Sequence, residues 1–462
     1  MKLVYGIKDK PKFGQMLVFA FQQLLAILAA TIAVPTVVNS VYPEAAMSQS
    51  AALFGAGVGT IVYLLFTKFK SPVFLGSSFA FLPSMLAAFA GGVSVSAGYV
   101  GLIFGALFAA LVYVIIAVIV KLAGTKWINK VMPSVVIGPT VAIIGLSLAG
   151  NAIGDAVSAA KNADGAFVMD THALVCLACG LVTFFAVVIC SVFGKKMMKL
   201  IPFIIGIVAG YVVAAIFTVI GNAASVEALK IIDFSKFQNM QWYPDFTFLK
   251  AFKGNFEWDG SFASYLGTIA VAYVPVAFVV FAEHLADHKN LSSIIEQDLL
   301  EDPGLSRTLL GDGVGSFAGA VFGGCPNTTY GESVGCVAIT GNASVVTILT
   351  TAILAIVISF FAPFVTFLST IPSCVMGGVC ITLYGFIAVS GLKMIQNVDL
   401  NDNRNLFVVS VILIAGVGGM KLAFGKVTLT GIACALILGI ITNAILGRKS
   451  AKEASEETKE EK

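Results

Sequence analysis

The chain has 462 residues, of which 58% are hydrophobic and 11% are charged, and its formal net charge is +3. A mean hydropathy of +0.95 excludes a soluble globular protein, because a soluble core could not hide so much apolar surface. The apolar runs are continuous and about 20 residues long, which suits helices that cross a bilayer and excludes the alternating strands of a β-barrel. We therefore expect an all-α polytopic membrane protein.

Fourteen apolar segments are expected to be transmembrane, and several of them are short or interrupted by glycine and proline. In chain order they are 15–38, 51–67, 73–90, 97–122, 131–151, 172–193, 199–221, 263–283, 308–324, 326–342, 345–368, 374–396, 405–418 and 427–446.

Lysine residues are unevenly distributed between the two ends of these segments. If the chain begins in the cytoplasm, the cytoplasmic side of the first half carries, besides the N-terminal lysines, Lys68, Lys70, Lys121, Lys126, Lys130, Lys195, Lys196 and Lys199. The opposite loops carry Lys161 beside the acidic residues Glu44, Asp155, Asp164 and Asp170. Positive charge is retained on the cytoplasmic side, so we expect a plasma (inner) membrane protein with both termini in the cytoplasm.

The two halves of the chain resemble each other. Residues 132–150 (MPSVVIGPTVAIIGLSLAG) and 371–391 (IPSCVMGGVCITLYGFIAVSG) share Pro-Ser-x-Val-x-Gly, and each forms the fifth segment of its half. Seven segments is an odd number, so the second half enters the membrane upside down and the halves form two inverted repeats. A structured extracellular loop is expected between them at 222–262, because it contains Trp242, Tyr243, Trp258 and several phenylalanines.

The third segment of each half is short and broken. It reads SPVFLGSSFAFLPS (71–84) in the first half and GGCPNTTYGES (323–333) in the second, and glycine and proline interrupt regular helix in both. Unwound backbone inside a membrane is tolerated where it lines a cavity, and there it exposes N–H and C=O groups to a ligand. Paired broken stretches in segments 3 and 10 therefore predict a binding site near mid-membrane.

Two acidic residues lie within apolar sequence near these stretches. Glu283 lies in FVVFAEHLADH and Glu332 lies in GGCPNTTYGESVG. A charge at mid-membrane costs roughly 2.5–3.5 kcal/mol on insertion scales, so acids that are retained there usually face a cavity, a partner or a substrate path. Both glutamates are candidates for the binding site.

Further ionisable residues follow Glu283. Asp287 is four residues on and therefore lies on the same helical face, where two carboxyl groups resist double ionisation and can carry a proton. His288 comes next and is also a candidate for proton coupling. Alternatively, Asp287 and His288 only mark the solvated cytoplasmic end of this helix.

A cluster of polar side chains precedes and includes Glu332, and its members are Asn327, Thr328, Thr329, Tyr330 and Glu332. A simple turn is the alternative here, and Ser77 and Ser78 in segment 3 could serve helix packing alone. The set suits a small, planar, neutral ligand with adjacent N–H and C=O groups. Phe79 or Tyr384 could pack on the face of its ring.

The eight cysteines lie in or beside apolar segments, and Cys176 and Cys179 form a C-x-x-C. No second pair and no histidine partner is expected nearby, so we interpret these thiols as small buried residues and expect no metal or cofactor. Residues 447–462 are expected to be a solvated cytoplasmic tail, which is too short and too mixed in charge to bind nucleic acid.

The chain resembles the nucleobase/ascorbate transporter family along nearly its whole length. The resemblance rests on GSSFAF (76–81), AEHLADHKNLSSII (282–295), DPGLSRTLLGDGVGS (302–316), PNTTYGES (326–333) and GCVAIT (335–340). It implies proton-coupled uptake of uracil by an elevator-type symporter with alternating access, often as a homodimer.

The same resemblance implies two domains and several residue roles. Segments 1–4 and 8–11 (1–125 and 263–370) would form a core that slides against a gate of segments 5–7 and 12–14 (126–221 and 371–446). Glu283 and Glu332 would hold the N–H groups of uracil. Backbone N–H groups of Phe79 and Gly331 would meet its carbonyls, and the pocket would also be lined by Ala30, Tyr330 and Tyr384.

Three positions depart from the family pattern. Ser333 stands where the signature has asparagine, and Gln22-Gln23 stands where many relatives read Gln-His. Asp287 stands where the pattern Glu-His-x-x-His has its second histidine. We expect Asp287 to be the coupled acid itself or to set the protonation of Glu283.

Other classes of function have weaker support in the sequence. An ion channel would need a ring-like filter motif, and an intramembrane enzyme would need a motif such as G-x-S-x-G or H-E-x-x-H, and neither is found. Among transporters, the main alternative to uracil is xanthine or urate, and anion exchange on the same architecture is a weaker one.

Overall fold

The computed structural model describes residues 3–124, 127, 133–195, 198, 201–238, 240, 242–254, 257, 260–396, 398–424 and 427–460. Within these residues, eight helical spans are long and apolar enough to cross a membrane: α1 (Phe13–Val41), α2 (Gln49–Phe66), α4 (Val95–Ala123), α6 with α7 (Ser134–Ser147 and Ala149–Val157), α8 (Thr171–Phe193), α10 (Pro202–Ala224), α12 (Phe262–Ile295) and α17 (Ser373–Met394). A ninth is bent by 82° between α15 (Val345–Ile358) and α16 (Ala362–Thr370). The chain is therefore a multi-pass helical membrane protein.

The helices in the remaining expected segments are too short or not apolar enough over a full span, so fewer than fourteen segments pass as complete spans within the described residues. They are the 3-10 turn η2 with α3 (Phe79–Phe81 and Leu82–Phe89), α13 (Leu305–Gly323), α14 (Gly331–Thr340), α18 (Asn403–Val417) and α19 (Gly431–Glu460). Before α19 the strands β3 (Leu422–Phe424) and β4 (Val427–Leu429) pair antiparallel, so helix begins a little later than expected in the last segment.

Extended backbone replaces helix at both of the segments that were expected to be broken. β1 (Leu75–Ser77) and β2 (Asn327–Thr329) pair antiparallel. The ladder continues where Ser78 N–H donates to Pro326 O at 2.9 Å. Backbone groups that would lack partners in hydrocarbon therefore satisfy one another across the two halves of the chain.

A glycine at the centre of β1 makes room for an aromatic ring. A Cβ atom on Gly76 would overlap the ring of Tyr330, whose hydroxyl donates to Ser77 O at 2.8 Å. Tyr330 directly follows β2, so this contact holds the second strand over the first. Any larger residue at position 76 would separate the strands.

The two segments with the shared Pro-Ser pattern pack directly on each other as α6 and α17. Gly138 of α6 abuts Gly391 of α17, and Gly145 abuts Tyr384, so the helices run antiparallel. None of the three glycines has room for a Cβ atom, and the two backbones therefore approach closely. The two segments with the shared motif thus meet antiparallel, as β1 and β2 do.

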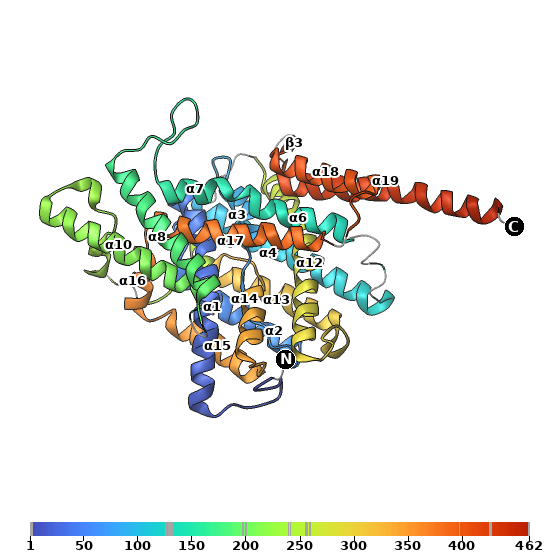
Figure 1. Ribbon diagram of the computed structural model, residues 1–462, viewed down its shortest axis with the longest axis horizontal. Coiled ribbons are helices and arrows are strands. Elements are labelled where there is room, and N and C mark those ends of the chain that lie inside the picture. The colour runs from blue at the N-terminus through green and yellow to red at the C-terminus, as the bar shows by residue number, and fades with distance from the viewer. Residues whose placement is uncertain are drawn as a thin grey trace.

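The helices form two groups that pack mainly within themselves. The first group contains α1–α4 and α12–α15, and the second contains α6–α10 and α17–α19 (Figure 1). The groups touch where α1 contacts α10 and α17, and where α12 contacts α6 and α19. The candidate site lies at this interface.

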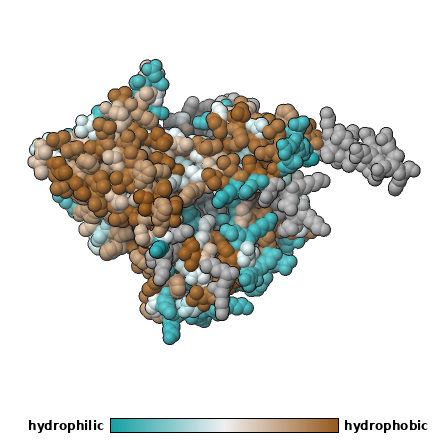
Figure 2. Space-filling view, viewed as in Figure 1, coloured by the Kyte–Doolittle hydropathy of each residue, from teal (hydrophilic) through white to brown (hydrophobic). Residues whose placement is uncertain are grey.

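Apolar side chains cover the outer surface of the second group. Figure 2 shows hydrophobic residues gathered over the part of the molecule where Figure 1 labels α8 and α10. Phe185 and Ile189 of α8, and Val212 and Ile216 of α10, are among the exposed large apolar residues. Such a surface suits contact with lipid.

The connection at 222–262 is structured. It holds η3 (Glu227–Leu229), η4 (Phe234–Gln238) and α11 (Thr247–Lys253). Phe246, just before α11, packs against Phe54 of α2 with 4.9 Å between ring centroids. Of the aromatic residues that predicted this structure, Trp242 and Tyr243 are exposed and Trp258 lies outside the described residues. Phenylalanines such as Phe246 fix the loop on the helices.

Candidate binding site

A cavity of about 450 Å³ lies between the two helix groups. Its first wall consists of Glu283 and Asp287 of α12, the end of β2 and the start of α14. Its second wall is mostly apolar and contains Val141, Phe203, Leu383, Phe386, Ile387 and Met394. A polar surface thus faces an apolar one across a space that suits a small molecule.

Two helical turns begin at this cavity. η2 starts at Phe79, directly after β1, and α14 starts at Gly331, close after β2. Neither start has a capping side chain, so the first backbone N–H groups are not occupied by a cap. Phe79 and Gly331 both line the cavity. These N–H groups can donate to ligand carbonyls, and the helix dipole adds partial positive charge there.

Three carboxyl groups face the same cavity. Glu283 and Asp287 lie one turn apart on α12, and Glu332 lies in the first turn of α14. Thr329 Oγ1 donates to Asp287 Oδ2 at 2.8 Å and so connects α12 to β2. Among the described residues, no side chain makes a hydrogen bond to the Glu283 carboxyl. Glu283 is therefore free to accept an N–H group from a ligand.

Behind Glu283, α12 holds a buried hydrogen-bonded network. His284 Nδ1 lies 2.7 Å from Asp312 Oδ2 of α13. His288 stacks on His284, with 4.0 Å between ring centroids, and its Nε2 lies 2.7 Å from the Tyr63 hydroxyl of α2. The network joins α12 to α13 and α2, and it fixes the orientation of the helix that carries Glu283.

The structure brings most of the expected site residues together. Those that line the cavity are Phe79, Glu283, Asp287, Tyr330, Gly331 and Glu332. Tyr384 lies behind Phe79, with 5.7 Å between ring centroids and the rings nearly perpendicular at 77°. Ala30 is buried about one turn beyond Ala26, which does line the cavity. His288 is fully buried against Tyr63 and is not part of the cavity wall.

Sequence reasoning missed Asp312 and the apolar wall. Asp312 carried a usable signal, because it is the single acid within the apolar residues of α13, as Glu283 is an acid within apolar sequence on α12. Phe203 and Phe386 carried no such signal, since the chain has 36 phenylalanines. Only the fold brings these two rings together, with 6.1 Å between their centroids.

A bundle of membrane helices in which two broken segments meet at an internal polar cavity is the architecture of a membrane permease. Solved structures share the fold. The transmembrane domain of a cyanobacterium bicarbonate transporter, BicA, has a TM-score of 0.58 at 15% identity, covering 95% of this chain and 100% of that one. The murine anion transporter Slc26a9, in its inward-facing state, has a TM-score of 0.63 at 12% identity, covering 96% and 69%.

The sequence comparisons are more specific. The profile of the Permease family matches residues 14–424. The uracil permease of Bacillus caldolyticus is 38% identical over 98% of this chain and 97% of its own, and that of Bacillus subtilis (strain 168) is 37% identical over 100% and 98%. The uracil permease of Escherichia coli (strain K12) is 33% identical over 94% and 92%. The chain belongs to this permease family, the nucleobase/ascorbate transporter family.

Proposed function

We propose that the protein takes up uracil across the plasma membrane together with protons. The observation that carries the proposal is that Glu283, Glu332 and the helix starts at Phe79 and Gly331 face one cavity. The relatives named uracil permeases, which match over nearly the full length, support the choice of ligand.

The chemistry of uracil suits this wall. Its planar ring carries two N–H groups and two carbonyls. Glu283 and Glu332 offer acceptors for the N–H groups, and the backbone N–H groups at Phe79 and Gly331 offer donors for the carbonyls. The uncharged ring fits against the apolar second wall, whereas an anion would be repelled by the three carboxyl groups of the first wall.

Asp287 is the proposed proton carrier. Three carboxyl groups around one cavity repel one another when all are ionised. This repulsion becomes stronger when a ligand displaces the water between them. A proton that neutralises one of the carboxyl groups therefore favours the ligand-bound state. Glu283 and Glu332 are engaged by the ligand in this proposal, which leaves Asp287. Its hydrogen bond from Thr329, at the end of β2, couples that proton to the strand pair.

We propose that the two helix groups are the core (1–125 and 263–370) and the gate (126–221 and 371–446) of an elevator built from two inverted seven-segment repeats. The antiparallel meetings of β1 with β2 and of α6 with α17 support this symmetry. The loop at 222–262 and the tail at 447–462 lie outside both domains. A homodimer remains a prediction from the family resemblance.

The proposed orientation keeps both termini in the cytoplasm, as the distribution of lysines indicates. Of those lysines, Lys126, Lys130, Lys196 and Lys199 lie outside the described residues. The cavity is lined by Pro202 and Phe203 at the start of α10 and by Met394 at the end of α17. With seven segments per half, both helix ends are cytoplasmic, so we propose that the structure is in an inward-facing state.

Competition of labelled uracil uptake by xanthine, thymine and cytosine, with and without a protonophore, tests the proposal. We expect uptake that unlabelled uracil abolishes and the protonophore strongly reduces. If xanthine competes and thymine does not, the protein is instead a xanthine or urate carrier of the same family. Large uncoupled currents would indicate a channel.

A further inference from the structure

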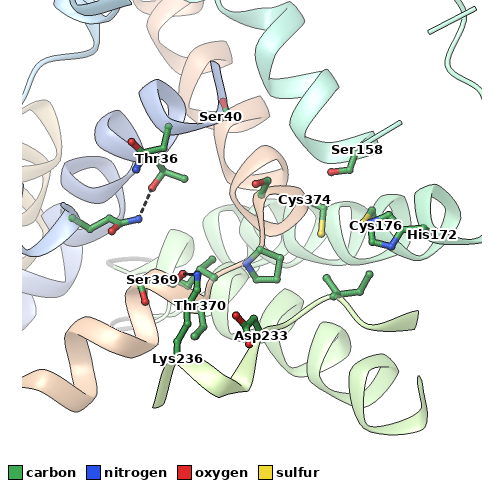
Figure 3. Close-up of a pocket in the computed structure, with 16 residues that line it drawn as sticks. Thr36, Ser40, Ser158, His172, Cys176, Asp233, Lys236, Ser369, Thr370 and Cys374 are labelled. Carbon is green, nitrogen blue, oxygen red and sulfur yellow. Dashed lines mark hydrogen bonds between the residues drawn. The ribbon is translucent and has the colours of Figure 1, made fainter. Parts of the chain in front are cut away.

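A second cavity, of about 430 Å³, lies at the other end of the helix bundle. Figure 3 shows it between Thr36 and Ser40 of α1, Cys176 and His172 of α8, and Cys374 at the start of α17. The segment with Asp233 and Lys236 and the end of α16 complete its wall. Under the proposed orientation, the end of α1 and the starts of α8 and α17 lie on the extracellular side, so we call it the outer cavity.

The outer cavity and the carboxyl-lined cavity share two helices. Ala26 of α1 lines the carboxyl-lined cavity and Thr36 lines the outer one, which separates them by about 15 Å at 1.5 Å per residue. On α17 the corresponding residues are Leu383 and Cys374, about 14 Å apart on the same measure. The two cavities therefore lie one above the other along the contact between α1 and α17, and about three helical turns of each helix separate them.

The lining of the outer cavity is polar and nearly neutral. Its uncharged donors and acceptors include Thr36, Asn39, Gln49, Ser158, Ser369 and Ser373. The two charged residues differ in sign. Lys236 Nζ donates to Ser369 O at 2.9 Å, and hydrogen bonds from Ser235 hold the pKa of the Asp233 carboxyl below its ordinary value.

The start of α17 adds backbone donors to this wall. The residue before the helix is Pro372, which makes no side-chain cap, and the first turn contains Ser373 and Cys374. All three residues line the outer cavity. The carboxyl-lined cavity likewise has uncapped helix starts, at η2 and α14, and its volume is similar, so each cavity has room for a small molecule and offers it backbone N–H donors.

We propose that the outer cavity is a second binding site for the transported ligand, a small neutral ring with adjacent N–H and C=O groups, and that it is filled from outside while the carboxyl-lined site faces the cytoplasm. This inference rests on the proposed function and orientation. It assigns a ligand to hydroxyl, amide and backbone groups that the carboxyl-lined site does not use.

Labelling of a cysteine at the cavity wall can report whether a ligand occupies the outer cavity, but the native cysteines are poorly placed for it. Cys176 and Cys374 border the outer cavity but are almost completely buried. The expectation that no histidine lies near Cys176 was wrong, because His172 Nε2 lies 3.5 Å from its sulfur, one turn earlier on α8. An exposed reporter is therefore better introduced at a serine. Ser373 lines the outer cavity and Ser390 the carboxyl-lined one, both are exposed, and both are on α17.

The test compares Ser373→Cys with Ser390→Cys in the full chain, with wild type as the background. A membrane-impermeant methanethiosulfonate is added to intact cells for the first variant and to inside-out vesicles for the second, with and without uracil. Uracil at about ten times its dissociation constant should slow labelling at each site about tenfold by mass action. Glu332→Gln is then added to each, because it disables only the carboxyl-lined site.

The two reporters are expected to respond differently: Glu332→Gln reduces protection of Ser390→Cys to about twofold or less and leaves the roughly tenfold protection of Ser373→Cys. Unliganded labelling of Ser373→Cys shows that the double variant is folded and inserted, and Glu283→Gln serves as a second disabling variant. Absence of labelling of Ser373→Cys from outside overturns the inference. So does loss of its protection in both glutamine variants. Uracil uptake by wild type is measured in the same cells, so failure of the proposed function is recognised separately.

Discussion

Gln23 Nε2 of α1 donates to Ser333 Oγ of α14 at 2.5 Å, and both side chains are buried. Both lie at positions where the family resemblance implies a different residue, and here they contact each other. Ser333 Oγ also accepts from Phe74 N–H, just before β1, at 3.1 Å. The Ser333 hydroxyl therefore connects three parts of the chain: α1 through Gln23, the residue before β1 through Phe74, and the first turn of α14, to which Ser333 itself belongs.

This contact predicts that positions 23 and 333 are coupled. Ser333→Asn alone inserts a larger side chain against Gln23. Gln23→His alone replaces the amide donor with a ring N–H at a different position, which no longer matches Ser333 Oγ. Each change should therefore lower both uracil uptake and thermal stability. The double variant should recover, with a coupling energy of about 0.5–3 kcal/mol. Thermal unfolding of the purified protein and uptake assays measure both. Additive losses would show that the contact is not specific.

Glu283→Gln and Glu332→Gln should each weaken uracil binding at the carboxyl-lined site by up to about 150-fold. Each replaces the charged acceptor of a hydrogen bond worth about 1.5–3 kcal/mol with a neutral amide oxygen, which accepts more weakly. Binding to purified protein is measured by calorimetry. Glu301→Gln is the matched control, since Glu301 is exposed between α12 and α13 and does not line the cavity. An equal loss in the control, or no loss in either glutamine variant, contradicts the site.

Asp287→Asn should abolish the rise of uracil uptake at lower external pH. Asparagine keeps an oxygen for the Thr329 hydroxyl but cannot take up a proton. Initial uptake rates across a range of external pH provide the measurement. His288→Gln is the contrast: it disturbs the contact with Tyr63 and should lower stability while the shape of the pH profile stays the same. An unchanged profile in Asp287→Asn removes Asp287 from the coupling mechanism.

Gly76→Ala should destabilise the protein by about 1–3 kcal/mol and suppress uptake, since the added methyl group overlaps the ring of Tyr330 and separates β1 from β2. Gly150→Ala on α7 is the control, because its Cβ atom would meet open space. Thermal unfolding in detergent compares the two. The strand pair would not require glycine if both variants melted alike.

Local sequence chemistry predicted the broken segments well. Gly76 and Gly331, with neighbouring prolines, interrupt apolar runs, and the structure places extended backbone or a helix start at these points. Whole spans were harder to predict, because α14 and α18 are too short to cross a bilayer alone. Their length depends on which neighbours cover their ends, and a run of apolar residues does not contain that information.

Helical periodicity explains both a success and a miss on α12. Glu283 and Asp287 are four residues apart and share the cavity, whereas His288 is five residues from Glu283, about 140° around the helix, and meets Tyr63 instead. The same rule could have excluded His288 from the cavity. The outer cavity could not be predicted, because its wall comes from several helices whose adjacency is a property of the fold.

The strand pair has a consequence for biosynthesis. Ser77 and Asn327 are paired partners 250 positions apart in the chain. At 5–20 residues per second, the ribosome needs roughly 10 to 50 s to make β2 after β1 has emerged. During that delay the backbone of β1 has no partner strand, and hydrocarbon cannot satisfy it. The nascent first half must therefore keep this stretch in water, or shielded by the insertion machinery, until the second half arrives.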